Sequence, residues 1–149
     1  ITLKLYAEHL FMLNLSSLKK ALLQIEKSLQ YCNSELAVND LEILKQFKSA
    51  SIQAFEYTFE LSIKMLKRQL KEMGMAAEEV DFFNYKDLIR AGAEKGLLEE
   101  PTLWFKYRDR RNITSHTYNE SKADEVYEIL PNFVESVIFF ISRLESYKE

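Results

Sequence analysis

Hydrophobic residues recur every three or four positions along most of the chain, which is the spacing of an amphipathic helix. The first regular run has Leu18, Leu22, Ile25 and Leu29 on one face. It predicts a helix that begins after an N-cap at Ser16 or Ser17 and ends near Cys32–Asn33. Residues 1–15 have no clean period, so both a weak helix and a loosely attached N-terminal arm fit them. Residues 34–39 are interpreted as a linker.

The longest pattern covers residues 40–73 and predicts the central helix of the protein. Asp40 can cap its start, and Gly74 suits the position just after its end. Two adjoining apolar stripes run along this segment, which implies at least two neighbouring helices. The positions are Leu44, Phe47, Ser51, Ala54, Thr58, Leu61 and Met65 for one stripe, and Ile52, Phe55, Phe59, Ile63, Leu66 and Leu70 for the other.

Two further helices are predicted in the middle of the chain. After a stretch without a clear pattern, Asn84 can cap a short helix over Tyr85–Lys95, and Gly96 follows it. Glu99, Glu100 and Pro101 then resemble the start of another helix, because proline suits the first turn and acids favour the positive end of the helix dipole.

The last predicted helix extends from Ser121 to about Tyr147. Ser121 and Asp124 have the spacing of a capping box at its start. Pro131 lies about two turns inside, so a kink or a short break is expected there. With no strand pattern and no repeat in the sequence, we predict an all-α fold, an antiparallel four-helix up-and-down bundle with a short additional helix. Residues 1–149 are expected to form a single domain.

The composition fits this architecture and narrows the function. Three Gly and two Pro leave few turns in 149 residues, and a net charge of −3 argues against a protein that coats nucleic acid over its whole surface. A lone Cys32 excludes an intramolecular disulfide, and no apolar run could cross a bilayer, so a cytoplasmic location without membrane contact is expected. Ile1 is not an initiator, and Met12 is an alternative start.

Residues 104–118 (WFKYRDRRNITSHTY) reverse the overall charge. Four cations, Lys106, Arg108, Arg110 and Arg111, stand against one acid, Asp109. Such a reversal marks a place where an anion could bind.

An aromatic and cationic stripe lies on one face of the helix predicted here. Trp104, Tyr107, Arg108, Arg111 and Ser115 are related by helical spacing. Two interpretations fit. The stripe could stack a base and hold a phosphate, or Trp104 and Tyr107 could be core residues while the arginines make surface ion pairs.

Arg111 and His116 carry the candidate chemistry. Histidine accepts a proton near neutral pH and arginine clamps a phosphate oxygen, a combination that suits attack of an RNA 2′-hydroxyl on the neighbouring phosphate. On a continuous helix the two would differ by roughly 140°. Either the helix ends near Thr114–Ser115 and turns His116 back, or another subunit completes the pocket. Asn112, four residues before His116, could orient the imidazole.

Glu56 and Glu60 lie one turn apart on the central helix. They could ligate a metal, or Glu60 could pair with Lys64. We favour a third interpretation, in which they contact Arg111 inside the bundle, because no His or Cys lies at ligand spacing nearby. Neither a metal nor another cofactor is therefore expected.

Two stretches resemble a known family over nearly the whole chain. The run Arg111-Asn112-Ile113-Thr114-Ser115-His116-Thr117-Tyr118 resembles the Arg-x4-His-x-Tyr motif of the HEPN superfamily. Residues 54–61 (AFEYTFEL) with Lys64 resemble the second-helix signature of one branch, the nucleotidyltransferase substrate-binding proteins. Members of that branch are four-helix bundles that dimerise and associate with a minimal nucleotidyltransferase, and the related HepT proteins are toxin ribonucleases.

The resemblance assigns Arg111 and His116 to the ribonuclease site, with Asn112 as support. It assigns Tyr118 to the tyrosine that the partner modifies with AMP, which switches the toxin off. In HEPN dimers the sites face each other across the interface. Trp104, Tyr107 and Arg108 have no counterpart in the motif and stay possible base or phosphate contacts.

Two functions are therefore expected. The first is a nucleotide-binding or substrate-binding subunit of a minimal nucleotidyltransferase, a homodimer within a larger hetero-oligomer of a toxin-antitoxin-like pair. The alternative is a HepT-like ribonuclease that needs no metal and is inactivated by AMPylation of Tyr118. In both, a nucleotide or an RNA phosphate binds at Arg111 and His116.

Overall fold

The computed structural model describes residues 2–147, with side chains described for residues 2–6 and 15–147. The elements along the chain are α1 (Thr2–Cys32), α2 (Glu35–Asn39), α3 (Leu41–Glu72), α4 (Ala77–Phe82), α5 (Tyr85–Glu94), α6 (Pro101–Asn112), the 3-10 turn η1 (Thr114–His116), α7 (Glu120–Glu128) and α8 (Leu130–Ser146). The described part of the chain contains no strand. The predicted all-α fold is confirmed.

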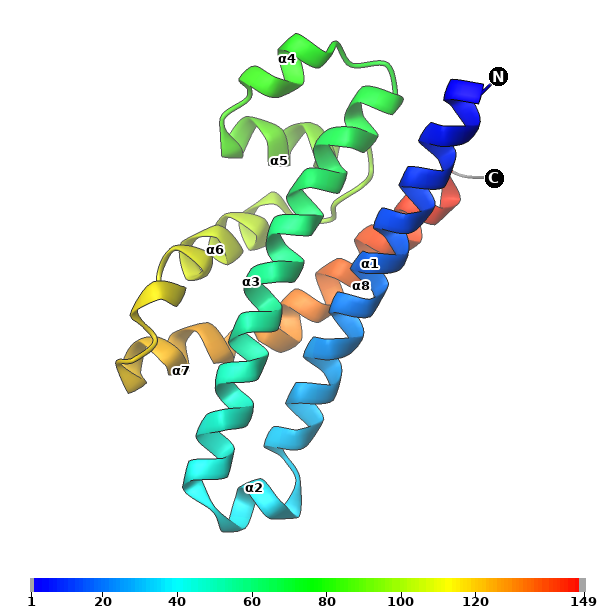
Figure 1. Ribbon diagram of the computed structural model, residues 1–149. Helices are drawn as coiled ribbons and strands as arrows, with labels where there is room; N and C mark the ends of the chain where they lie inside the picture. Colours follow the sequence, from blue (N-terminus) through cyan, green and yellow to red (C-terminus); the bar gives the residue numbers. More distant parts are fainter. Residues whose placement is uncertain (1, 148–149) are drawn as a thin grey trace.

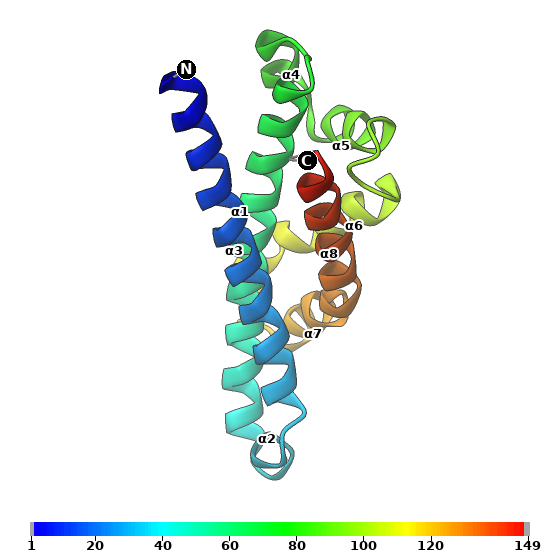
Figure 2. The same cartoon turned by 90° about the vertical axis from the view of Figure 1, so that its right-hand side faces the viewer.

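Four helices alternate in direction and form the bundle. In Figure 1, α1 descends, α3 returns beside it, α6 descends and α8 rises again, so that α1 begins and α8 ends at the same end of the molecule. The shorter elements α2, α4, α5, η1 and α7 make the connections. Figure 2 shows that α1 and the pair α5–α6 lie on opposite sides of this bundle.

Helix α3 is the central helix, as its two apolar stripes predict. It packs against α1, α2, α4, α5, α6, α7 and α8. Asp40 caps its start by accepting hydrogen bonds from the backbone of Glu42 and Ile43, and Gly74 follows its end with a φ of +100°. Asn84 caps α5, and Pro101 occupies the first turn of α6. These predicted signals are all confirmed.

Three predictions about the ends of helices need correction. Backbone residues from Thr2 onward already belong to α1, so Ser16 and Ser17 are interior positions and not N-caps. The predicted 34–39 linker contains α2, which Ser34 caps. Asn119, rather than Ser121, caps the helix that begins at Glu120. The stretches before α2 and α7 each offer more than one residue that could cap a helix, and the structure shows which of them does.

The break that Pro131 predicts lies two residues earlier, at Ile129. Here α7 ends and α8 begins, with Pro131 in the first turn of α8, where its missing N–H costs nothing. As a result, α7 runs across the bundle and α8 along it (Figure 1).

An aromatic cluster fills the space between α3, α6 and α8. The Phe55 and Phe133 rings lie 4.8 Å apart at an interplanar angle of 85°, and the Tyr107 and Phe133 rings 5.1 Å apart at 85°. Edge-to-face pairs of this kind add to the stabilisation from area burial. The cluster fixes α6, and with it the cationic run, against the bundle.

Candidate functional site

Helix α6 presents Trp104 and Tyr107 to the core and not to solvent. Trp104 is 2% exposed and Tyr107 is fully buried. The hydroxyls of Tyr107 and Ser136 lie 2.6 Å apart, and burial raises the pKa of Tyr107. Of the two interpretations of the stripe, the core role therefore applies to both residues. In this conformation neither ring is open to a base, which corrects their assignment as possible contacts.

Arg108, from the same stripe, is exposed. Its guanidinium carbon lies 4.6 Å from the centre of the Tyr85 ring, and the Tyr85 hydroxyl donates a 2.7 Å hydrogen bond to the carbonyl of Trp104. Burial raises the pKa of Tyr85, and the charge of Arg108 acts in the opposite direction. Arg108 thus lies on the surface where an anion could reach it.

Arg111 sits in the last turn of α6 and points toward α3. Its Nη2 lies 2.5 Å from Oε1 of Glu60, and its Nη1 lies 3.7 Å from Oε2 of Glu56. Nη1 also donates a 2.9 Å hydrogen bond to Oγ1 of Thr114. The predicted contact of Glu56 and Glu60 with Arg111 is confirmed. These partners fix the guanidinium, and a phosphate would share or displace them.

The helix ends before it reaches His116. Helix α6 stops at Asn112, slightly earlier than predicted, and η1 carries His116 on a separate turn. Thr114 closes this turn: its hydroxyl donates a 2.8 Å hydrogen bond to the carbonyl of Arg111 while it accepts from the Arg111 side chain. The helical offset of roughly 140° therefore does not apply to Arg111 and His116.

Asn112 and His116 are both exposed. Within the part of the chain whose side chains are described, no hydrogen bond joins them. The expected four-residue contact is absent because the helix that would create it has already ended. The imidazole of His116 instead lies beside Tyr118, with ring centres 6.2 Å apart and an interplanar angle of 72°.

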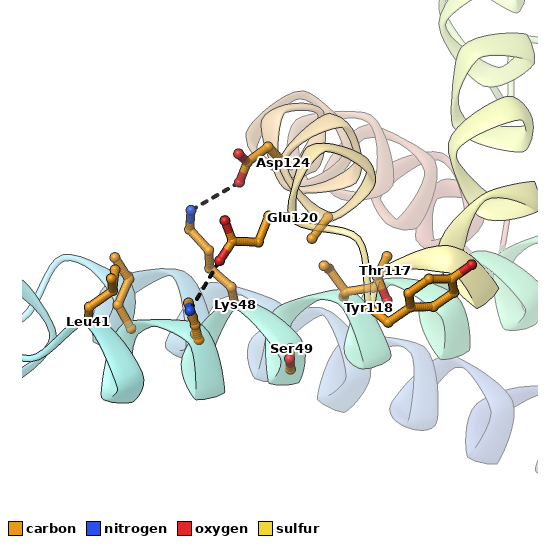
Figure 3. Close-up of a pocket in the computed structure, with 11 residues that line it drawn as sticks. Leu41, Lys48, Ser49, Thr117, Tyr118, Glu120 and Asp124 are labelled. Atoms are coloured by element: carbon orange, nitrogen blue, oxygen red, sulfur yellow. Dashed lines mark hydrogen bonds and ion pairs between the residues drawn. The ribbon is translucent and has the colours of Figure 1, made fainter.

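Tyr118 is 86% exposed and stands at the edge of a groove between α3 and α7. The groove has a volume of about 430 Å³. Lys48 in it lies 3.3 Å from Asp124, and Lys45 lies 3.1 Å from Glu120. Figure 3 shows the Tyr118 ring extending away from Lys48 and Asp124, with its hydroxyl at the outer end. Tyr118 is thus open to solvent.

Sequence reasoning missed Thr114, Lys45 and Lys48. Thr114 had a usable signal, because a threonine hydroxyl in or just after a helix often bonds the carbonyl three or four residues back. Lys45 and Lys48 had no usable signal in the sequence, because their partners on α7 are distant along the chain. Lys48 and Asp124, for example, are 76 residues apart.

The described residues contain neither a candidate metal cluster nor a candidate membrane span. Among the side chains that the structure describes, no three His, Cys, Asp or Glu residues are grouped so as to hold a metal ion. No helix in the described residues is both long and apolar enough to cross a membrane.

Comparison with known proteins places the chain in a family. A family model described as "Nucleotidyltransferase substrate binding protein like" matches residues 13–146. A Haemophilus influenzae protein named "Probable ribonuclease HepT" is 38% identical over 96 residues, which is 64% of this chain and 66% of that protein's length. The alignment thus spans just under two thirds of that relative.

Two solved structures share the fold. One, from Haemophilus influenzae, is described as the fold of a substrate-binding domain of a nucleotidyltransferase; it is 31% identical, with a TM-score of 0.82 over 88% of this chain and 98% of that one. A structure from Thermus thermophilus is 30% identical, with a TM-score of 0.65 over 85% of this chain and 98% of that one. The chain belongs to the family of nucleotidyltransferase substrate-binding-like proteins.

Proposed function

We propose that this protein is the substrate-binding partner of a minimal nucleotidyltransferase, within a two-component pair of the toxin-antitoxin kind. The family and the solved relative described as a nucleotidyltransferase substrate-binding domain support the partnership. The observation that carries the proposal is the exposed Tyr118 beside His116, just after the end of the helix that holds Arg111, whose guanidinium is fixed by Glu60 and Thr114. In this proposal Tyr118 supplies the acceptor hydroxyl, and Arg111 is the cation that holds a nucleotide phosphate.

The proposed modification transfers an adenylyl group to Tyr118. The phenolic oxygen attacks the α-phosphorus of ATP, pyrophosphate leaves, and the phenolic proton goes to solvent or to a base of the partner. The product carries a bulky anion beside His116, which blocks access to the site by charge and by volume. Modification would in this way switch off any activity that uses Arg111 and His116.

A two-fold homodimer within a larger hetero-oligomer, in a reducing cytosol, is part of this proposal. A second copy facing the first would place two exposed His116 side chains near one phosphodiester. The mass of the assembly, measured by light scattering with and without the nucleotidyltransferase, tests this point. A strictly monomeric chain in both samples would contradict it.

The decisive experiment co-expresses the chain with the minimal nucleotidyltransferase, purifies the complex and measures the mass of the chain. We expect a stable complex and an adenylyl adduct that peptide mapping places on Tyr118. Tyr118→Phe should form the complex without the adduct, and Tyr57→Phe, another exposed tyrosine, should keep the adduct. Failure to form any complex at micromolar concentration would rule out the partnership.

A second candidate function is RNA cleavage, supported by the relative named as a ribonuclease and by the exposed His116, which lies on the short turn that Thr114 joins to Arg111. In this reaction His116 removes the proton of a 2′-hydroxyl, and the freed oxygen attacks the adjacent phosphorus. The 5′-oxygen leaves with a proton and a 2′,3′-cyclic phosphate remains, while Arg111 balances the charge that builds on the phosphate oxygens.

Expression without the partner separates the two candidates. A ribonuclease should arrest growth and fragment RNA, and His116→Ala should remove both effects. An unmodified wild-type chain that leaves RNA intact would exclude cleavage and leave the binding role in place.

A further inference from the structure

Helices α5 and α6 together form a strongly basic face, which the candidate site does not account for. Lys86 and Arg90 of α5 and Arg108 of α6 lie at the contact between the two helices. Lys106 and Arg110 add positive charge on other sides of α6. The two helices hold three acids: Asp87 and Glu94 in α5, where Glu94 is the last residue, and Asp109 in α6. A chain with a net charge of −3 thus concentrates positive charge on this face.

The cations of each helix reach an aromatic ring of the other. Nζ of Lys86 lies 5.7 Å from the centre of the Phe105 ring, and the guanidinium carbon of Arg90 lies 5.6 Å from it. In the opposite direction, Arg108 lies 4.6 Å from the ring of Tyr85. Phe105 and Tyr85 are both half-buried. The two helices therefore present one mixed surface of charge and aromatic rings.

Among the described residues, most of this charge has no close acidic partner. The ion pair of Arg90 with Asp87 is long, at 4.0 Å, and the described residues provide no ion pair for the other four cations. The lysines of the α3–α7 groove differ, since Lys45 and Lys48 each have an acid within 3.3 Å. The basic face thus has charge left for an external anion.

We propose that this α5–α6 face binds a single-stranded RNA, with phosphates on the cations and bases against Phe105 and Tyr85. Repeated cations interleaved with aromatic faces suit a strand that repeats a phosphate and a base at each nucleotide. Helix α6 continues from this surface directly to Arg111, so the strand would lead into the candidate site. The proposal rests on the second candidate function, because it gives that site an RNA path.

The test measures binding of a labelled single-stranded RNA by fluorescence anisotropy over a series of salt concentrations. His116→Ala is present in every protein, so that cleavage does not interfere. We expect the double variant Lys86→Gln/Arg90→Gln to bind more weakly for all RNA sequences. The slope of log K against log salt should fall by about 1.4, at roughly 0.7 for each lost phosphate contact. The side chains of Lys86 and Arg90, and those of Lys4 and Lys27 in the control, are all exposed, so neither double variant should change the circular dichroism spectrum.

Lys4→Gln/Lys27→Gln is the matched control, since it removes two exposed charges from α1, on the other side of the bundle (Figure 2). This control should retain the wild-type slope. Equal slopes for the two double variants would overturn the proposal, as would wild-type binding to poly-glutamate as tight as to RNA, which would indicate an acidic protein partner.

Cleavage is measured separately with His116 intact. If Lys86→Gln/Arg90→Gln leaves RNA binding unchanged and the protein still cleaves RNA, the RNA path is overturned and the ribonuclease is retained. A reduced slope in a chain that leaves RNA intact retains the RNA path and excludes the ribonuclease.

Discussion

The guanidinium of Arg111 and the carboxylate of Glu60 form a 2.5 Å contact between α6 and α3, across a sequence separation of 51 residues. Glu56, one turn earlier on α3, lies 3.7 Å from the same guanidinium. The arginine is thus held in one orientation before any ligand arrives. A fixed cation stabilises developing negative charge better than a mobile one, because it needs no reorganisation during the reaction.

In the proposed ribonuclease reaction, Glu60→Gln should lower RNA cleavage more than Glu56→Gln, because Glu60 makes the shorter contact with Arg111. Both glutamates are partly exposed, with side chains 55% and 34% accessible, so the free energy of unfolding should change by less than about 1 kcal/mol in each variant. Single-turnover rates at saturating RNA, together with thermal melts, provide the measurement. Equal rates for the two variants would show that Glu60 does not position Arg111.

Thr114→Val should uncouple Arg111 from the turn that carries His116. The buried Thr114 hydroxyl bonds both the side chain and the carbonyl of Arg111, so its loss should destabilise the fold by about 1–2 kcal/mol. Urea denaturation measures this cost. Thr117→Val, which removes a single 3.0 Å bond to the carbonyl of Thr114, is the matched control and should cost less.

Trp104→Ala should act through stability alone. Trp104 is almost fully buried in the aromatic cluster, and its removal should cost about 3–5 kcal/mol of unfolding free energy. Arg108→Gln, on the exposed side of the same helix, should change that energy by less than about 0.5 kcal/mol. Denaturant titrations of both variants test the assignment. A Trp104→Ala protein as stable as the wild type would show that the ring is not part of the core.

The stability of the protein should fall as the pH rises above about 10. Burial raises the pKa of Tyr85 and of Tyr107 in the folded state, so both keep their protons at a pH where the unfolded chain, with tyrosine pKa values of about 10, releases them. Their contribution is fully present below that pH and is lost as the pH rises toward the folded-state pKa. Each tyrosine should lower the unfolding free energy by up to about 1.4 kcal/mol per pH unit.

Urea titrations between about pH 9 and pH 11 measure this loss, with the range set by the unfolded tyrosine pKa of about 10. Tyr85→Phe should reduce the slope with pH, whereas Tyr31→Phe, at an exposed position, should leave it unchanged. A Tyr85→Phe protein with the wild-type slope would contradict the role of its buried hydroxyl.

The sequence predicted the fold well because its signals are local. Asp40, Gly74, Asn84 and Pro101 each act through backbone groups within a few residues, and all four hold the predicted positions. The same logic failed at Ser121, where the nearby Asn119 competes for the same role and caps the helix instead.

The candidate site was less predictable because its geometry depends on the tertiary structure. Helical spacing placed Trp104, Tyr107, Arg108 and Arg111 on one face, but spacing alone cannot tell whether that face meets the core or solvent. The structure divides it: the aromatic rings enter the core, and Arg108 stays outside. The predicted contact of Asn112 with His116 is absent for a related reason. Helical spacing relates two residues only while the helix continues, and α6 ends at Asn112.

The end of α6 at Asn112 has a consequence for how this protein can vary. Arg111 belongs to the rigid frame, whereas His116 belongs to a short loop that joins α6 to α7. Loops tolerate insertions and deletions far better than packed helices do. A relative with one residue more or fewer in this loop would therefore keep its core intact while its imidazole is aimed elsewhere.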